Sequence, residues 1–265
     1  MKNLTKGNPV KLMLEFALPV CLGNIFQLFY SLADTRIVGS VLGETSLAAV
    51  GATTAVSTLL IGFLQGLTNG FAIVAAQSFG SGKTERLRKA AAGTLLLGTL
   101  TTLAITVLAL AGLEGFLKIL NVPETLYAEA KGYIQIVLAG MMVTMLYNAC
   151  AGILRAVGDT VAPLLFLMCA ALLNVGLDIL FMAVVPLGVQ GAALGTVLAQ
   201  LVSVVLSIGY MWKKYPVFHL KRKDFRIGKA MIKQMYSSGL SMGMMMSLVF
   251  FGTLALQCAI NTFWQ

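Results

Sequence analysis

The chain has 265 residues, of which 58% are apolar and 11% charged, with a mean hydropathy of +0.88 and a formal net charge of +9. A soluble domain carries about 25% charged residues. The composition therefore excludes a soluble enzyme core, a disordered chain and a nucleic-acid-binding arm, and nucleic acid is not an expected partner. It indicates an integral membrane protein whose first partner is the lipid bilayer.

Long stretches of the sequence carry no charge, and a helix needs about 20 apolar residues to cross a bilayer. Turn and loop residues divide these stretches into six complete spans and a seventh that reaches the last residue. The expected fold class is therefore an all-α polytopic membrane protein. The predicted spans cover residues 11–38, 46–78, 88–112, 127–154, 162–185, 190–212 and 231–265.

Lysine and arginine are distributed unevenly between the two sides that these spans define. If the N-terminus is cytoplasmic, only Arg36, Lys118 and Lys131 of the 19 basic residues lie on the outer side. Cytoplasmic loops of membrane proteins carry an excess of Lys and Arg. We therefore expect a multi-pass protein of the cell membrane with a cytoplasmic N-terminus.

The longest segment between spans on the basic side predicts the domain organisation. Residues 213–230 form a basic cytoplasmic loop. We expect this loop to separate an N-terminal six-helix transmembrane lobe, residues 1–212, from a seventh transmembrane helix, residues 231–265, which belongs to an incomplete second lobe.

Two carboxylates lie well inside predicted spans, Asp34 and Asp178, and neither has a Lys or Arg four residues away. An ionisable group in a span costs roughly 2.5 to 3.5 kcal/mol on insertion and is a functional candidate by default. Helical spacing places Gln27 on the stripe of Asp34, and Asn174 one turn before Asp178. A helical rise of about 1.5 Å per residue places both aspartates and Thr196 roughly 9 to 12 Å below the outer surface. Oxygen ligands at one depth suit a proton or Na⁺. An alternative for the Ser and Thr residues that recur along one face of a span is that they serve helix packing.

Several segments resemble those of multidrug and toxic compound extrusion (MATE) transporters, in the same order and over essentially residues 8–265. The pair Asn174 and Asp178 is similar to the DinF-like branch of that family. The matching segments are Asp34-Thr35 with Val38-Gly39, residues 47–51 (LAAVG), residues 148–160 (NACAGILRAVGDT), Asn174-x-x-x-Asp178 and residues 188–193 (GVQGAA).

The resemblance implies a six-helix lobe of the MATE fold, in the MOP superfamily, followed by the start of a second lobe. It implies a cation-coupled antiporter that exports drugs or amphipathic and cationic organic compounds, with H⁺ or Na⁺ as coupling ion and no other metal or cofactor. The cation-binding residues that it implies are Asp34, Asn174, Asp178 and Thr196. The cavity-lining residues that it implies are Gln27, Tyr133 and Asn148. Straight-helix counting places Asn148 about 30 Å from the outer face, so its helix would have to bend or tilt.

The family has two six-helix lobes, whereas this chain stops in the seventh helix. The expectation is a truncated or split half that works with a complementary second lobe or a second copy, or a half-protein that does not transport. A lipid-linked oligosaccharide flippase of the same superfamily is the alternative, but no Lys or Arg lies deep in any span to hold a pyrophosphate. A membrane hydrolase with paired aspartates would need a different sequence context, so we do not expect an enzyme.

Two local patterns lie outside the spans. Residues 80–84 (GSGKT) resemble the end of a phosphate-binding loop, but Gln77 stands where the first glycine is required and no strand precedes them. A turn whose basic residues contact lipid headgroups is the expected structure. Arg155 and Asp159 are four residues apart between the fourth and fifth spans, which predicts an ion pair.

Overall fold

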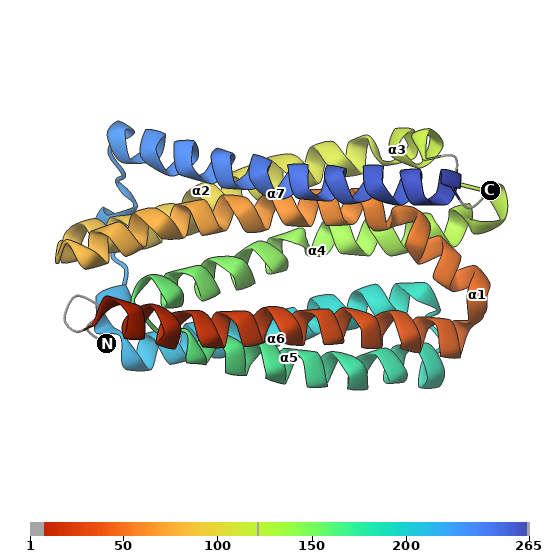
Figure 1. The fold of residues 1–265 in the computed structure, drawn as a ribbon, viewed down its shortest axis with the longest axis horizontal. Helices are drawn as coiled ribbons and strands as arrows, with labels where there is room; N and C mark the ends of the chain where they lie inside the picture. Colours follow the sequence, from red (N-terminus) through yellow and green to blue (C-terminus); the bar gives the residue numbers. More distant parts are fainter. Residues whose placement is uncertain (1–7, 121, 264–265) are drawn as a thin grey trace.

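The computed structural model describes residues 8–120 and 122–263, and these residues form helices and turns without any strand (Figure 1). This confirms the all-α fold class. The α-helices are α1 (Pro9–Gly80), α2 (Thr84–Ala111), α3 (Leu113–Ile119), α4 (Glu124–Ala156), α5 (Val161–Ile179), α6 (Val189–Lys214) and α7 (Lys229–Phe263). A π-helical segment, η1 (Leu180–Val184), follows α5, and two 3₁₀ turns, η2 (Pro216–Phe218) and η3 (Arg222–Phe225), lie between α6 and α7.

Helix α1 consists of two antiparallel legs that meet near Gly43, where φ is 85° and ψ is −178°. Figure 1 shows the first leg (red) running the length of the bundle and the second leg (orange) returning beside α7. The sequence predicted a break over residues 39–45, but only Gly43 leaves the helical conformation. A glycine adopts positive φ without a steric penalty, so the turn between the first two spans needs no loop.

Six helical segments of the described residues are long and apolar enough to cross a membrane. Many of their large apolar side chains are exposed, among them Leu28, Leu172 and Val205. Such side chains suit contact with lipid, which is as apolar as they are. Helix α7 covers the predicted seventh span as far as Phe263. The six apolar segments overlap the first six predicted spans. They are Val10–Thr54, Val56–Gly80, Thr84–Ala111, Glu124–Ala156, Val161–Val184 and Val189–Lys214.

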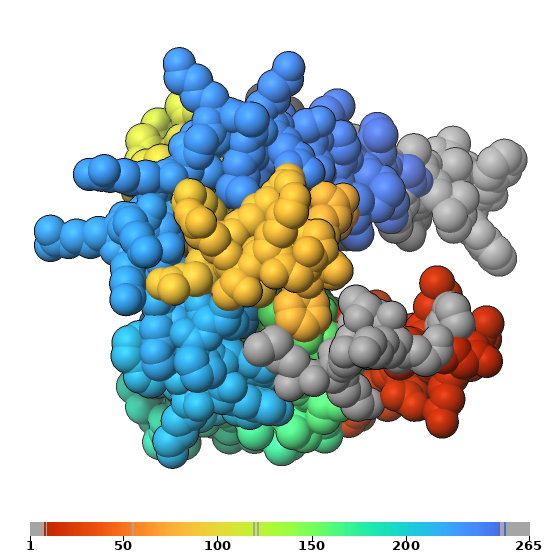
Figure 2. All heavy atoms as spheres, turned by 90° about the vertical axis from the view of Figure 1, so that its left-hand side faces the viewer, coloured from red at the N-terminus to blue at the C-terminus, as the bar shows by residue number. Residues whose placement is uncertain are grey.

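The bundle has two unlike ends. At one end, here called the basic end, α1, α4 and α6 finish and α2, α5 and α7 begin, beside the basic loop 213–230. Figure 2 views this end, where the loop and the start of α7 (blue) lie beside the end of α1 and the start of α2 (orange). The other end, here called the Pro186 end, holds Gly43, α3 and the hairpin between η1 and α6.

Helix α7 packs against the second leg of α1 through small residues. An added Cβ at Gly70 would overlap the carbonyl oxygen of Ser238, so the two backbones are in contact. Glycines four residues apart permit this close approach between membrane helices. The glycines at the crossing are Gly66 and Gly70 on α1 and Gly239 and Gly243 on α7.

The loop between α6 and α7 is attached to the bundle by one ion pair. The buried carboxylate of Asp224 accepts hydrogen bonds from the Arg88 guanidinium and the Lys221 backbone amide, both at 2.7 Å. The hydrogen bond from the Lys221 amide lowers the pKa of Asp224 below its usual range, and Arg88 lowers it further. Burial acts in the opposite direction but does not outweigh these effects. This contact keeps the loop against α2.

The predicted ion pair between Arg155 and Asp159 is wrong. Helix α4 ends at Ala156, and Gly158 then takes a φ of 83°, so the helical spacing no longer applies. Arg155 instead donates to Asn69 Oδ1 at 3.1 Å, and Asp159 is paired with Lys214.

Candidate cation site

The structure brings together two carboxyl groups that are far apart in the sequence. Asp34 on the first leg of α1 and Asp178 on α5 lie close enough for their charges to interact. Asp178 is completely buried, and Asp34 is partly buried. Two carboxylates this close repel one another unless a proton or another cation lies between them. We call this arrangement the Asp34–Asp178 site.

A hydrogen-bond network connects the site to three helices. The Asn174 side-chain amide donates to Asp178 Oδ1 at 3.1 Å and to Thr196 Oγ1 at 3.3 Å. The Tyr30 hydroxyl donates to the same Thr196 oxygen at 3.2 Å. Asn174 is completely buried. The four residues that the resemblance assigned to cation binding therefore lie together, joined by Tyr30.

Three oxygen atoms at the site are buried and have no hydrogen-bond partner within the described part of the chain. They are Asp34 Oδ1, Asn174 Oδ1 and Asp178 Oδ2. All three can accept a hydrogen bond, and a buried acceptor without a partner costs about 1–3 kcal/mol. A proton or a hard cation would satisfy such acceptors. No cluster of three or more His, Cys, Asp and Glu residues exists within the described part.

Local backbone features let α6 approach Asp178. An added Cβ at Gly195 would overlap Asp178 Oδ1, and one at Gly191 would lie 2.9 Å from Phe181 Cβ. The backbone also becomes π-helical from Leu180 to Val184, directly after α5. Short π-helical segments are frequent at functional sites.

Sequence reasoning missed three residues of the site and its surroundings, although each has a detectable signal. Tyr30 lies one helical turn before Asp34 and near Gln27, so it belongs on the stripe that the sequence analysis described. Gly195 and Gly191 form a small-xxx-small pair beside Thr196, a pattern typical of close helix packing.

The three residues expected to line the lobe have different places. Tyr133 lies near enough to Asp34 and Asp178 to interact with their charges. Gln27 lines two small cavities of about 40 and 50 Å³ next to the site, one of them shared with Tyr30. Asn148 lies apart from the carboxyl pair: its amide donates to the Thr144 carbonyl at 3.0 Å, and its side chain lines the cavity that reaches Arg155.

Comparisons with known proteins agree with this architecture. The family model MatE matches residues 19–180. The protein of Bacillus subtilis (strain 168) named "Probable multidrug resistance protein YpnP" is 27% identical over 262 residues, which cover 98% of this chain and 58% of that protein. YoeA of the same organism, also named a probable multidrug resistance protein, is 30% identical over 93% of this chain and 55% of its own length.

Solved structures show the same fold. A MOP superfamily transporter from Pyrococcus furiosus superposes with a TM-score of 0.85 at 26% identity, over 98% of this chain and 56% of that one. An outward-facing multidrug resistance MATE family transporter superposes with a TM-score of 0.82 at 28% identity, over 94% of this chain and 54% of that one. The chain thus spans about half the length of the relatives that it matches.

Proposed function

The chain belongs to the MATE family of transporters, and from this premise we propose that it forms one lobe of a cation-coupled exporter of small organic compounds. The observation that carries the proposal is the group of three buried oxygen atoms without partners at the Asp34–Asp178 site. No Lys or Arg of the described residues pairs with either carboxyl group, so the site is complete only when a cation from solution occupies it. Its occupation changes the charge in the bundle and can favour one helix arrangement over another.

We propose the proton as the coupling ion. The hydroxyl oxygen of Thr196 accepts hydrogen bonds from both Tyr30 and Asn174. A hydroxyl has two acceptor lone pairs, so Thr196 cannot also coordinate Na⁺ unless one of these bonds breaks. A proton shared between Asp34 and Asp178 needs no such change.

The proposed movement involves α1, α5 and α6, since each contributes to the network. When the site is empty, repulsion between Asp34 and Asp178 favours their separation, and when a proton bridges them, the first leg of α1 is held against α5. Tyr30 transmits this change to α6 through Thr196. No cofactor takes part in this mechanism.

We also propose the membrane location, the cargo and the partner of this lobe. The excess of Lys and Arg at the basic end supports a cytoplasmic location for that end and for the N-terminus, in the cell membrane. The cargo is a small drug or an amphipathic or cationic organic compound. The other wall of the transport path would come from a complementary second lobe or a second copy.

The protonation step is tested by infrared difference spectroscopy between acidic and alkaline pH, on the purified chain in lipid nanodiscs. The carboxyl band of the site should disappear in Asp34→Asn and in Asp178→Asn. It should persist in Glu44→Gln, which removes an exposed carboxylate from the same helix α1. Unchanged spectra in both aspartate variants would contradict the proposal. Loss of the band on adding Na⁺ would identify Na⁺, rather than the proton, as the coupling ion.

The transport step is tested by efflux of a fluorescent organic cation from cells that produce the chain alone or together with a complementary second lobe. We expect efflux in at least one of these settings, and its loss in Asp178→Asn at equal expression. Equal efflux in the variant and the unaltered chain would contradict coupling through this site.

A further inference from the structure

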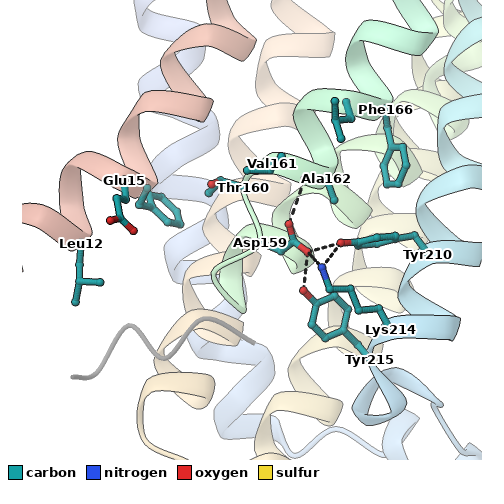
Figure 3. Close-up of a pocket in the computed structure, with 12 residues that line it drawn as sticks. Leu12, Glu15, Asp159, Thr160, Val161, Ala162, Phe166, Tyr210, Lys214 and Tyr215 are labelled. Carbon is teal, nitrogen blue, oxygen red and sulfur yellow. Dashed lines mark hydrogen bonds and ion pairs between the residues drawn. The ribbon is translucent and has the colours of Figure 1, made fainter. Parts of the chain in front are cut away.

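A separate cavity of about 480 Å³ lies at the basic end, between the beginning of α1 and the adjoining ends of α5 and α6 (Figure 3). Its volume is within the range of roughly 300–1,000 Å³ typical of small-molecule sites. The residues that carry the argument are Phe16, Asp159, Phe166, Tyr210, Lys214 and Tyr215. None of them belongs to the Asp34–Asp178 site.

The carboxylate of Asp159 is the centre of this cavity wall. Its Oδ2 accepts hydrogen bonds from the hydroxyl groups of Tyr215 at 2.6 Å and Tyr210 at 2.8 Å, and from the Lys214 ammonium at 3.1 Å. Its Oδ1 accepts from the Ala162 backbone amide at 3.2 Å, which fixes the carboxylate at the start of α5. Figure 3 shows the two tyrosine hydroxyls and the lysine pointing at Asp159.

The Lys214 ammonium occupies an aromatic cage. It lies 4.8 Å from the centre of the Tyr210 ring and 5.6 Å from that of Tyr215, and it also contacts the Tyr210 hydroxyl. A cation within about 6 Å of an aromatic ring is attracted to the ring face, and cages of this type recognise substituted ammonium ions. Carboxylate and rings together make a complete ammonium site, which the chain fills with its own side chain.

The Lys214 side chain is accessible from solvent. Lys214 is the last residue of α6, and 49% of its side-chain surface is exposed, whereas Tyr215 is buried and Asp159 is 11% exposed. A lysine carries its charge on a flexible four-carbon stem. The ammonium therefore reaches the cage from the solvent side, while the groups that bind it are held in place by the fold.

We propose that this cavity binds an organic ammonium ion, whose charged group replaces the Lys214 ammonium against Asp159, Tyr210 and Tyr215. The apolar part of the ligand lies on the rings of Phe16 and Phe166. Binding here goes beyond the proposed function, because it requires no cation at the Asp34–Asp178 site. In a working exporter the cavity would hold a cationic compound at the basic end before transport.

The test measures choline binding to the purified chain by isothermal titration calorimetry, in nanodiscs of phosphatidylglycerol only. Lys214→Ala removes the internal competitor and should bind choline about tenfold more tightly than the unaltered chain. Lys213→Ala removes the neighbouring charge outside the cavity and should leave the affinity unchanged. The neutral isostere 3,3-dimethylbutanol should not bind. Equal choline affinity in the unaltered chain and Lys214→Ala, or equal binding of the two ligands, would overturn the proposal.

Further variants test the carboxylate of the cage and its independence from the Asp34–Asp178 site. In the Lys214→Ala background, Asp159→Asn should weaken choline binding at least tenfold, and circular dichroism will establish that the double variant is folded. Asp178→Asn should keep full choline affinity, so failure of the cation-coupling proposal would leave this one standing. The same titration in nanodiscs that contain phosphatidylcholine tests whether a lipid headgroup supplies the ammonium group. If it does, the lipid competes with choline and the measured choline affinity falls. Undiminished binding in the Asp159 variant would refute the cage.

Discussion

Two aspartates of this bundle, the buried Asp178 and the partly buried Asp159, have opposite surroundings. Asp178 receives one hydrogen bond, from Asn174, and its other oxygen has no partner among the described residues. Asp159 receives four, three of them from the side chains of α6 and the residue that follows it. The difference teaches that burial alone does not make a carboxylate an ion site. Asp178 lacks donors and needs a cation from solution, whereas Asp159 is held in place by protein donors, of which only the Lys214 ammonium is the one that we propose a ligand replaces.

The largest expected effect is the loss of coupled efflux when the carboxylate of Asp178 is removed. Asp178→Asn should reduce coupled efflux to background, a loss of at least tenfold, because an amide cannot take up the proton that bridges the pair. Efflux at equal expression measures it. Glu44→Gln is the matched control on α1 and should transport normally.

The next effect tests the close approach of α6 to Asp178. Gly195→Ala places a Cβ against Asp178 Oδ1 and should destabilise the fold by about 1–3 kcal/mol while disturbing the carboxyl band. Gly209→Ala on the same helix meets no atom within 4 Å and should be neutral or slightly stabilising. Thermal unfolding of both variants gives the comparison, and equal melting temperatures would contradict this packing.

A smaller effect follows from cutting the link between α1 and α6. Tyr30→Phe removes the hydrogen bond to Thr196 and should lower stability by about 1 kcal/mol. It should also slow coupled efflux without abolishing it, since both carboxyl groups remain. Transport rate and chemical unfolding measure the two effects, and an unchanged rate would exclude Tyr30 from the coupling path.

The smallest effect concerns pH and Asp159. Burial would raise the pKa of its carboxyl, but hydrogen bonds from Tyr215, Tyr210 and the Ala162 amide outweigh this effect and hold the pKa below its usual range. A lowered pKa contributes stability above the unfolded value of about 3.9, and this stability is lost as the pH falls further. Asp159→Asn should therefore lower stability by about 1 kcal/mol at pH 7.

The same difference should be smaller at about pH 3, where the unfolded carboxyl is largely protonated, and it vanishes only once the folded carboxyl is protonated as well. Chemical unfolding at the two pH values measures it. A constant difference across this range would show that the charge of Asp159 contributes nothing to the cluster.

Much of the fold follows from local sequence. The charge-free stretches predicted the helices because each apolar stretch must form its backbone hydrogen bonds internally in lipid. The predicted turn at the first hairpin was too long, since a single glycine at position 43 suffices. The predicted pairing of Arg155 with Asp159 failed because Gly158 turns the chain between them, and helical spacing applies only within a helix.

The sequence by itself determined the class of protein and the helix limits to within a few residues, because composition and periodicity are local properties. Its resemblance to the family supplied the candidate set Asp34, Asn174, Asp178 and Thr196. Only the tertiary structure decided which oxygens lack donors, and that Tyr30 and Gly195 complete the site. It also decided that Lys214, rather than Arg155, pairs with Asp159. The physical reason is that hydrogen-bond satisfaction depends on which helix faces meet, and those faces join residues as distant in the chain as Tyr30 and Thr196, 166 positions apart.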